Sequence, residues 1–258
     1  MSPMPPRPTH AERFRAAGLT AILLALCSLV AVTALTVSSS HRTVSSEHHT
    51  IVVIGASVSG GYRTTSGAAW PEWIDRRLKM AGLPVSVVNA SVSATRLLTR
   101  NDDGRPSALD REERDALAVP GVHTIVLTDV INDIQQPPHQ YDPQAIIGGF
   151  KEFVSRAHAR GVRVVATTIP PYNGFPRYEL AGERCRQAIN TYIRRSGLFD
   201  SILDFDSVLK DPADPTRIRP AYDSGDHLHP NDRGHHAIAE AIDLRQLTSS
   251  PIDQALPS

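Results

Sequence analysis

Five short runs of apolar, mostly β-branched residues constrain the fold of this 258-residue chain more than any other feature. Each run is bounded by segments with helical periodicity, a pattern typical of β-strands that alternate with helices. Strands that are apolar along their whole length are buried on both faces, which indicates a parallel sheet covered by helices on each side. The runs are Thr50–Gly55, Val85–Asn89, Thr124–Leu127, Val162–Thr167 and Ile202–Phe205.

The segments between these runs carry helix start and stop signals. A serine precedes one segment as a potential cap, a proline opens another, and glycines follow several of them. No internal repeat and no second domain is indicated, so we predict one α/β domain over residues 49–247 with a C-terminal tail, 248–258. The predicted helices are Trp70–Ala81, Ser107–Leu117, Asp142–Arg160, Ala181–Arg195 and one after Pro230.

Residues 1–48 are predicted to lie outside this domain. The run Ala16–Val37 contains no charged residue and is long enough to span a membrane, and three arginines precede it. Two alternatives remain open: an uncleaved membrane anchor, or a signal peptide cleaved after Ala34. In both cases we expect the domain to be exported. An uncleaved anchor would tether it to the membrane through the polar linker Ser38–His48.

The composition argues against one class of partner. The formal net charge is zero and no polybasic run occurs, which disfavours nucleic acid as the main partner. Aromatic residues make up only 5% of the chain, so no carbohydrate-stacking platform is evident. With 41% hydrophobic and 21% charged residues, the chain is predicted to form a packed core.

Polar residues follow the predicted strands at positions where a parallel sheet gathers its functional groups. Ser57 follows the first strand, Ser91 the second and Asn132 the third, while Asp226 and His229 lie beyond the last strand. The carboxyl ends of parallel strands meet at one edge, so we expect these side chains to lie close together. Residues three apart share a helical face. The carboxylate can therefore orient the imidazole, which can take the proton of a serine hydroxyl.

In order and spacing, four blocks resemble the SGNH hydrolases, also called GDSL esterases. Gly55–Ser57 is similar to the Gly-Asp-Ser block, Asn89–Ser91 to Asn-x-Gly, Val130–Asp133 to Gly-x-Asn-Asp, and Asp226–Pro230 to Asp-x-x-His-Pro. The resemblance covers about residues 50–245. It implies a three-layer α/β/α sandwich with a flavodoxin-like parallel five-stranded sheet, and a carboxylic ester hydrolase that needs neither cofactor nor metal.

The resemblance also implies a role for each matched residue. Ser57 would be the nucleophile, and His229 the general base and then the general acid, oriented by Asp226. The oxyanion hole would consist of the Ser57 and Ser91 backbone N–H groups and the Asn132 side-chain amide. Loss of one such donor typically lowers the rate by roughly 10²–10³.

Three residues depart from the family pattern. Ala56 stands where the family has an aspartate beside the nucleophile, and its presence is expected to alter the geometry of the loop. Ser91 and Val130 replace glycines, so we expect a narrower pocket and a more restricted backbone. Together with the lack of a lid-like insertion, these departures favour short acyl groups. The substrate is expected to be a small-molecule or polysaccharide ester, and the oligomeric state is left open.

Three alternative functions compete with ester hydrolysis. Asp226, His227, His229 and His235 are possible metal ligands, although no second ligand set occurs upstream. The departures also allow a non-catalytic binding module, and the same acyl-enzyme could pass its acyl group to a sugar of the cell envelope. We interpret His227 as a rim residue, and His235 and His236 as surface or boundary residues of the last helix.

Overall fold

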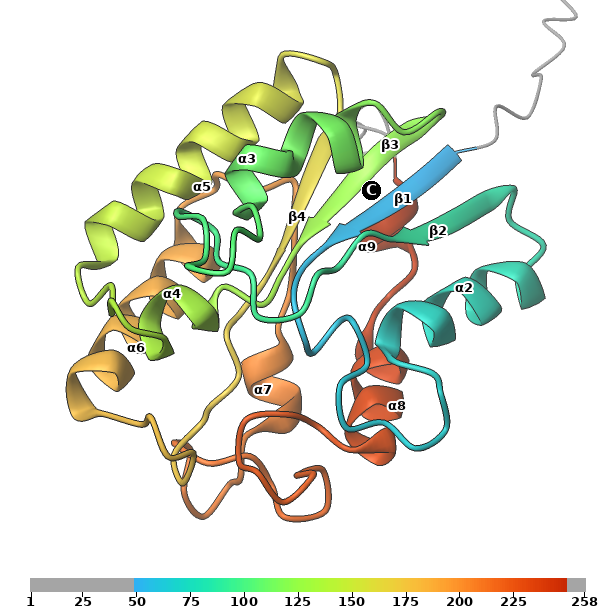
Figure 1. The fold of residues 1–258 in the computed structure, drawn as a ribbon. Helices are drawn as coiled ribbons and strands as arrows, with labels where there is room; N and C mark the ends of the chain where they lie inside the picture. Colours follow the sequence, from blue (N-terminus) through green and yellow to red (C-terminus); the bar gives the residue numbers. More distant parts are fainter. Residues whose placement is uncertain (1–48, 250–258) are drawn as a thin grey trace, which may run out of the picture. The chain divides into compact units, whose positions relative to one another are not determined.

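A parallel five-stranded sheet forms the centre of the computed structural model, which describes residues 49–249 (Figure 1). The strand order is β2-β1-β3-β4-β5, and all four neighbouring pairs are parallel, as predicted for a flavodoxin-like sheet. The strands are β1 (His49–Ile54), β2 (Val85–Asn89), β3 (Val122–Leu127), β4 (Arg163–Thr167) and β5 (Ser201–Leu203).

Helices cover both faces of this sheet, so the fold is the predicted three-layer α/β/α sandwich (Figure 1). One layer contains α3 (Ala108–Glu112), its π-helical continuation η1 (Glu113–Leu117), α5 (Pro143–His158) and α6 (Leu180–Arg195). The other layer contains α2 (Trp70–Met80) and α8 (Asp232–Ala241).

The central strands β1, β3 and β4 contribute buried side chains to both cores, because successive side chains point to opposite faces of a sheet. The edge strand β2 buries only Val85, which corrects the prediction that all five runs are buried on both faces. In β1, Val52 and Ile54 pack with the layer of α3, α5 and α6, whereas Ile51 and Val53 pack with the layer of α2 and α8. All four side chains are at most 2% exposed. This double burial explains why the strand is apolar at every position.

The predicted serine cap is confirmed, and a second side-chain cap, Asp142, begins α5. The Ser107 hydroxyl accepts a hydrogen bond from the Asp110 N–H (3.1 Å), and the Asp142 carboxylate accepts one from the Gln144 N–H (2.9 Å). Three short helices were not predicted, because four or five residues are too few to show helical periodicity. They are α4 (Ile131–Gln135), α7 (Phe205–Leu209) and α9 (Arg245–Thr248).

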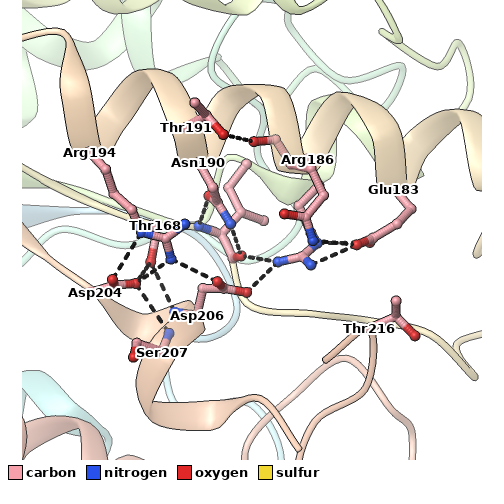
Figure 2. A network of polar contacts seen from close by, with 12 residues as sticks. Thr168, Glu183, Arg186, Asn190, Thr191, Arg194, Asp204, Asp206, Ser207 and Thr216 are labelled. Atoms are coloured by element: carbon pink, nitrogen blue, oxygen red, sulfur yellow. Dashed lines mark hydrogen bonds and ion pairs between the residues drawn. The ribbon is translucent and has the colours of Figure 1, made fainter. Parts of the chain in front are cut away.

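A buried ionic network joins α6 to the chain that follows β4 and β5 (Figure 2). The Arg186 side chain is fully buried and pairs with Glu183 (2.7 Å) and Asp206 (2.6 Å). It also donates to the carbonyl oxygen of Ile169 (2.8 Å). Asn190 Oδ1 accepts a hydrogen bond from the Ile169 N–H (2.7 Å), and Asn190 Nδ2 donates one to the Ile169 carbonyl oxygen (2.9 Å). The network therefore fixes the start of the loop after β4.

No helix within residues 49–249 is long and apolar enough to cross a membrane. The predicted anchor or signal segment, Ala16–Val37, lies outside the described residues, as does the end of the C-terminal tail, 250–258.

Candidate active site

Three side chains from distant parts of the chain form one hydrogen-bonded series. His229 Nε2 lies 2.9 Å from Ser57 Oγ, and His229 Nδ1 lies 2.8 Å from Asp226 Oδ2. Ser57 comes from the loop after β1, whereas Asp226 and His229 come from the loop before α8. The structure thus brings together the three residues that the sequence grouped, at distances that allow proton transfer.

The turn that presents His229 also orders the Asp226 carboxylate. Asp226 Oδ1 accepts hydrogen bonds from the N–H groups of Leu228 (3.0 Å) and His229 (2.9 Å). Burial alone would raise the pKa of Asp226, but these two bonds and the contact with the imidazole lower its pKa to about 2. The carboxylate is therefore ionised at neutral pH. It favours a proton on His229 Nδ1, which leaves Nε2 to accept the serine proton.

Two neighbouring residues, Tyr62 and Arg63, contact His229 and Asp226 respectively. The Tyr62 ring packs edge-on against the His229 ring, with 4.7 Å between centroids. Arg63 Nε lies 3.5 Å from Asp226 Oδ2, but half of the arginine side chain is exposed, so this ion pair contributes little to stability. The His229 side chain is 8% exposed, and the tyrosine contact restricts rotation of its ring.

A carboxylate from the loop after β3 holds the turn that carries Ser57. Asp129 Oδ2 accepts hydrogen bonds from the Ala56 N–H (2.7 Å), the Ser59 N–H (2.9 Å) and the Ser59 hydroxyl (2.7 Å). Gly55 leaves room for this contact, because a Cβ there would lie 2.1 Å from Ser59 Oγ. Asp129 therefore fixes the chain on both sides of the serine.

These contacts explain how Ala56 is accommodated. The sequence predicts a change in loop geometry where the family aspartate is missing, and in this chain Asp129 supplies a carboxylate to that turn. Asp129 has φ +61°, a conformation that aspartate adopts more readily than most residues.

If Ser57 reacts with substrate, replacement of Asp129 by alanine is expected to lower kcat by up to about 100-fold, because misplacing a reacting group by about 1 Å has effects of that size. It should also destabilise the fold by about 1–3 kcal/mol, since buried donors lose their acceptor. Asp129→Asn is the matched control, because its amide oxygen can still accept from the three donors. Kinetics and thermal unfolding of both variants test this prediction, and equal losses in the two variants would contradict it.

Asn132 reaches the same site from the first turn of α4. Its Nδ2 donates to the Thr95 carbonyl (2.9 Å), and its Oδ1 accepts from Gln135 Nε2 (2.8 Å). A side-chain amide has two N–H groups, so one remains for a group bound beside Ser57. The side chain is 2% exposed and is therefore firmly positioned.

Asp133, the next residue, anchors α4 to the loop after β2. Its carboxylate accepts hydrogen bonds from the N–H groups of Leu97 (2.6 Å) and Leu98 (2.9 Å). Burial raises its pKa to about 6, while the two bonds act in the opposite direction. The Asn-Asp pair of the third block thus combines an amide beside the serine with a structural carboxylate.

Ser91 is a correction to the expected set of site residues. Its N–H donates to Asn89 Oδ1 (3.2 Å), its hydroxyl donates to Ser59 Oγ (2.7 Å), and it does not line the cavity beside Ser57. Val130 also lies away from this cavity and has φ −68°, so its backbone is unstrained. Neither residue therefore narrows the pocket as expected.

Ala94, three residues beyond Ser91, belongs to the same loop after β2. It lines the cavity with Ser57 and Asn132 and has φ +64°, which is unusual for alanine. Within residues 49–249, the N–H groups of Ser57 and Ala94 make no hydrogen bond. These two N–H groups and the free amide N–H of Asn132 are available to donate to a group bound beside Ser57.

The cavity beside Ser57 has a volume of about 560 Å³. This size is typical of a small-molecule site. Its wall includes both aromatic and cationic side chains, among them Tyr62, Arg63, Phe175, Arg177 and His227.

The other histidines differ in their surroundings. His227 lies at the rim, as predicted, with its Nδ1 2.5 Å from Asp223 Oδ2. His235 is fully buried and accepts a hydrogen bond from the Trp70 N–H (3.3 Å), which corrects the prediction of a surface or boundary residue. Burial lowers the pKa of His235 to about 4, because α8 packs this side chain against α2. His236 is half exposed.

The four candidate metal ligands do not converge. Asp226 and His229 face each other, His227 faces Asp223, and His235 is buried against α2. In the part of the chain that the structure describes, no group of three histidine, cysteine, aspartate or glutamate side chains could hold a metal ion.

A family model matches most of this domain. It is described as the GDSL-like Lipase/Acylhydrolase family and covers residues 53–237, from β1 into α8. The matched span contains Ser57, Ala94, Asn132, Asp226 and His229. No curated protein has a significant match to the chain.

Solved structures share the fold. The aryl esterase of M. smegmatis has 14% identity and a TM-score of 0.61, with 77% of this chain and 99% of that chain covered. A GDSL-like lipase from Bacteroides thetaiotaomicron has 17% identity and a TM-score of 0.58, with coverages of 81% and 90%. A catalytic mutant of an acetylxylan esterase from Geobacillus stearothermophilus has 17% identity and a TM-score of 0.58, with coverages of 78% and 94%.

Proposed function

We propose that this chain, a serine ester hydrolase of the GDSL-like lipase/acylhydrolase family, cleaves carboxylic esters with small acyl groups. In this proposal Ser57, His229 and Asp226 form the catalytic triad. The observation that carries this proposal is the series from Ser57 Oγ to His229 (2.9 Å) and from His229 to Asp226 (2.8 Å). The assembled series also favours an enzyme over a non-catalytic binding module.

In the proposed reaction, Ser57 Oγ attacks the ester carbonyl while His229 Nε2 removes its proton. The tetrahedral oxyanion accepts hydrogen bonds from the N–H groups of Ser57 and Ala94 and from Asn132 Nδ2. His229 then gives the proton to the leaving alcohol, and an acyl-enzyme forms on Ser57. A water molecule, deprotonated by His229, attacks the acyl group and releases the acid. Asp226 stabilises the imidazolium in both half-reactions.

A panel of nitrophenyl esters of increasing acyl length tests this proposal. We expect acetyl and butyryl esters to be cleaved faster than octanoyl and longer esters, because no lid-like insertion is evident that would shelter a long chain from water. Faster cleavage of the long esters would contradict the small-acyl proposal. Addition of a soluble sugar to the same assay tests the remaining alternative, since an acyltransferase would form an acetylated sugar.

Extended treatment with a metal chelator is expected to leave the esterase activity unchanged. The proposed mechanism uses a serine nucleophile and hydrogen-bond donors, so no step depends on a Lewis acid. The measurement is kcat/KM before and after dialysis against the chelator. Loss of activity that zinc restores would instead support metal-assisted hydrolysis.

We also propose that the domain acts outside the cytoplasmic membrane. The uncharged run Ala16–Val37 and the arginines before it support export, either with an anchor or after cleavage near Ala34. Cell fractionation with mass mapping of the mature N-terminus distinguishes the two forms. A membrane-bound intact chain supports the anchor, and a soluble product that begins near Leu35 supports secretion. An intact chain in the cytosol would contradict export.

A further inference from the structure

His227 occupies a backbone conformation that a side chain makes unfavourable. Its φ is +64°, and a residue other than glycine in the left-handed region is destabilised by roughly 1–2 kcal/mol. Asp223 holds the backbone of this turn, because its Oδ1 accepts from the N–H groups of Gly225 (2.8 Å) and His227 (3.0 Å). These backbone bonds need no imidazole, so the turn itself does not explain why a histidine is present.

The imidazole is nevertheless held firmly. His227 Nδ1 lies 2.5 Å from Asp223 Oδ2, and this carboxylate is only 10% exposed. On the other side the ring packs on Gly174, where a Cβ would come within 2.9 Å of the ring. The His227 side chain remains 42% exposed and lines the cavity that contains Ser57 and His229.

The hydrogen bond to Asp223 determines what the ring can offer a substrate. In the neutral tautomer that suits this contact, Nδ1–H donates to the Asp223 carboxylate, so Nε2 carries a lone pair and can accept a hydrogen bond. Within residues 49–249 this nitrogen has no partner. A strained, oriented acceptor beside a nucleophile fits a hydroxyl or another neutral donor of the substrate.

The position of His227 in the chain indicates which part of the substrate carries this hydrogen-bond donor. His227 lies two residues before His229, the proposed proton donor to the leaving alcohol, and both line one cavity. We propose that His227 Nε2 accepts a hydrogen bond from a free hydroxyl of the alcohol part, and thus selects esters of polyhydroxylated alcohols. This inference rests on the proposed function, since it assumes ester cleavage at Ser57.

Two acetate esters that differ only in their hydroxyl groups test this role. Glycerol 1-acetate carries two free hydroxyls on the alcohol part, and propyl acetate carries none. In the wild-type chain we expect a higher kcat/KM for glycerol 1-acetate. In His227→Gly, which relaxes at φ +64°, the ratio of the two kcat/KM values is expected to fall about fivefold, as for loss of one hydrogen bond. The loss should appear mainly in KM.

A second variant separates binding from structure. His227→Gln retains an acceptor and should recover part of the wild-type ratio. The inference would be overturned if the ratio of the two kcat/KM values did not change in His227→Gly. An unchanged ratio with equal losses for both esters would indicate a structural role. Propyl acetate and a fluorophosphonate probe of Ser57 report on the proposed function separately. If neither the probe nor either ester reacted with the wild-type chain, the proposed function would fail, and this inference with it.

Discussion

Replacement of Ser57 by alanine is expected to lower kcat/KM for p-nitrophenyl acetate by at least about 10⁴-fold, because the proposed acyl-enzyme cannot form without the hydroxyl. The turn itself should be unchanged, since Asp129 bonds the flanking residues Ala56 and Ser59 rather than Ser57. A fluorophosphonate probe should modify the wild-type chain once, at Ser57, and leave Ser57→Ala unlabelled. Peptide mapping and initial rates provide the two measurements.

A surface serine provides the matched control. Ser155 is exposed on α5, and its replacement by alanine should leave both the rate and the labelling as in the wild-type chain. Full activity in Ser57→Ala, or probe labelling at another serine, would contradict the proposal that Ser57 is the nucleophile. Unchanged circular dichroism of the variant would show that the lost rate reflects chemistry rather than unfolding.

Replacement of Arg186 by alanine is expected to have the largest effect on stability, about 3–5 kcal/mol. The arginine side chain is fully buried, and its removal leaves the Glu183 carboxylate without its cation, whereas Asp206 keeps only its contact with Arg194 (Figure 2). Urea unfolding, with the slope of the transition compared between variants, measures the loss. Arg184→Ala is the control, because this exposed side chain lies on the same helix and should change stability by less than about 0.5 kcal/mol.

The same substitution should also affect the cavity. Arg186 donates to the carbonyl of Ile169, at the start of the loop that brings Gly174, Phe175 and Arg177 to the cavity wall. We therefore expect a raised KM in any Arg186→Ala protein that still folds. A variant with wild-type stability would contradict this prediction of lower stability, and would show that Glu183 needs no cation once Arg194 alone holds Asp206.

Most of the sheet could be predicted from the sequence, because the central strands β1 and β4 are buried at nearly every position and carry mostly apolar runs. The edge strands β2 and β5 are only partly buried, although their runs are also rich in apolar residues. Ser57, Asp226 and His229 could be grouped for a related reason: parallel strands send their carboxyl ends to one edge, and the Asp-x-x-His spacing is local. These inferences depend on residue type and spacing alone.

Ala94 and Asp129 could not be found in this way. Both have positive φ values. Glycine in a sequence often indicates that conformation, whereas alanine and aspartate do not predict it. The role of Asp129 depends on a contact between the loops that follow β1 and β3, and that of Ala94 on which residues of a loop line the cavity. The burial of His235 was missed because it depends on how α8 packs against α2.

The contact between Ala56 and Asp129 spans 73 positions of the chain. A growing polypeptide that has emerged only as far as β2 contains Ser57 but not the acceptor that steadies its turn. The reactive geometry of the serine therefore arises after β1 and β3 have paired, a non-local step that is slow compared with helix formation. During refolding, enzyme activity and probe labelling should consequently appear with sheet assembly and later than helical circular dichroism.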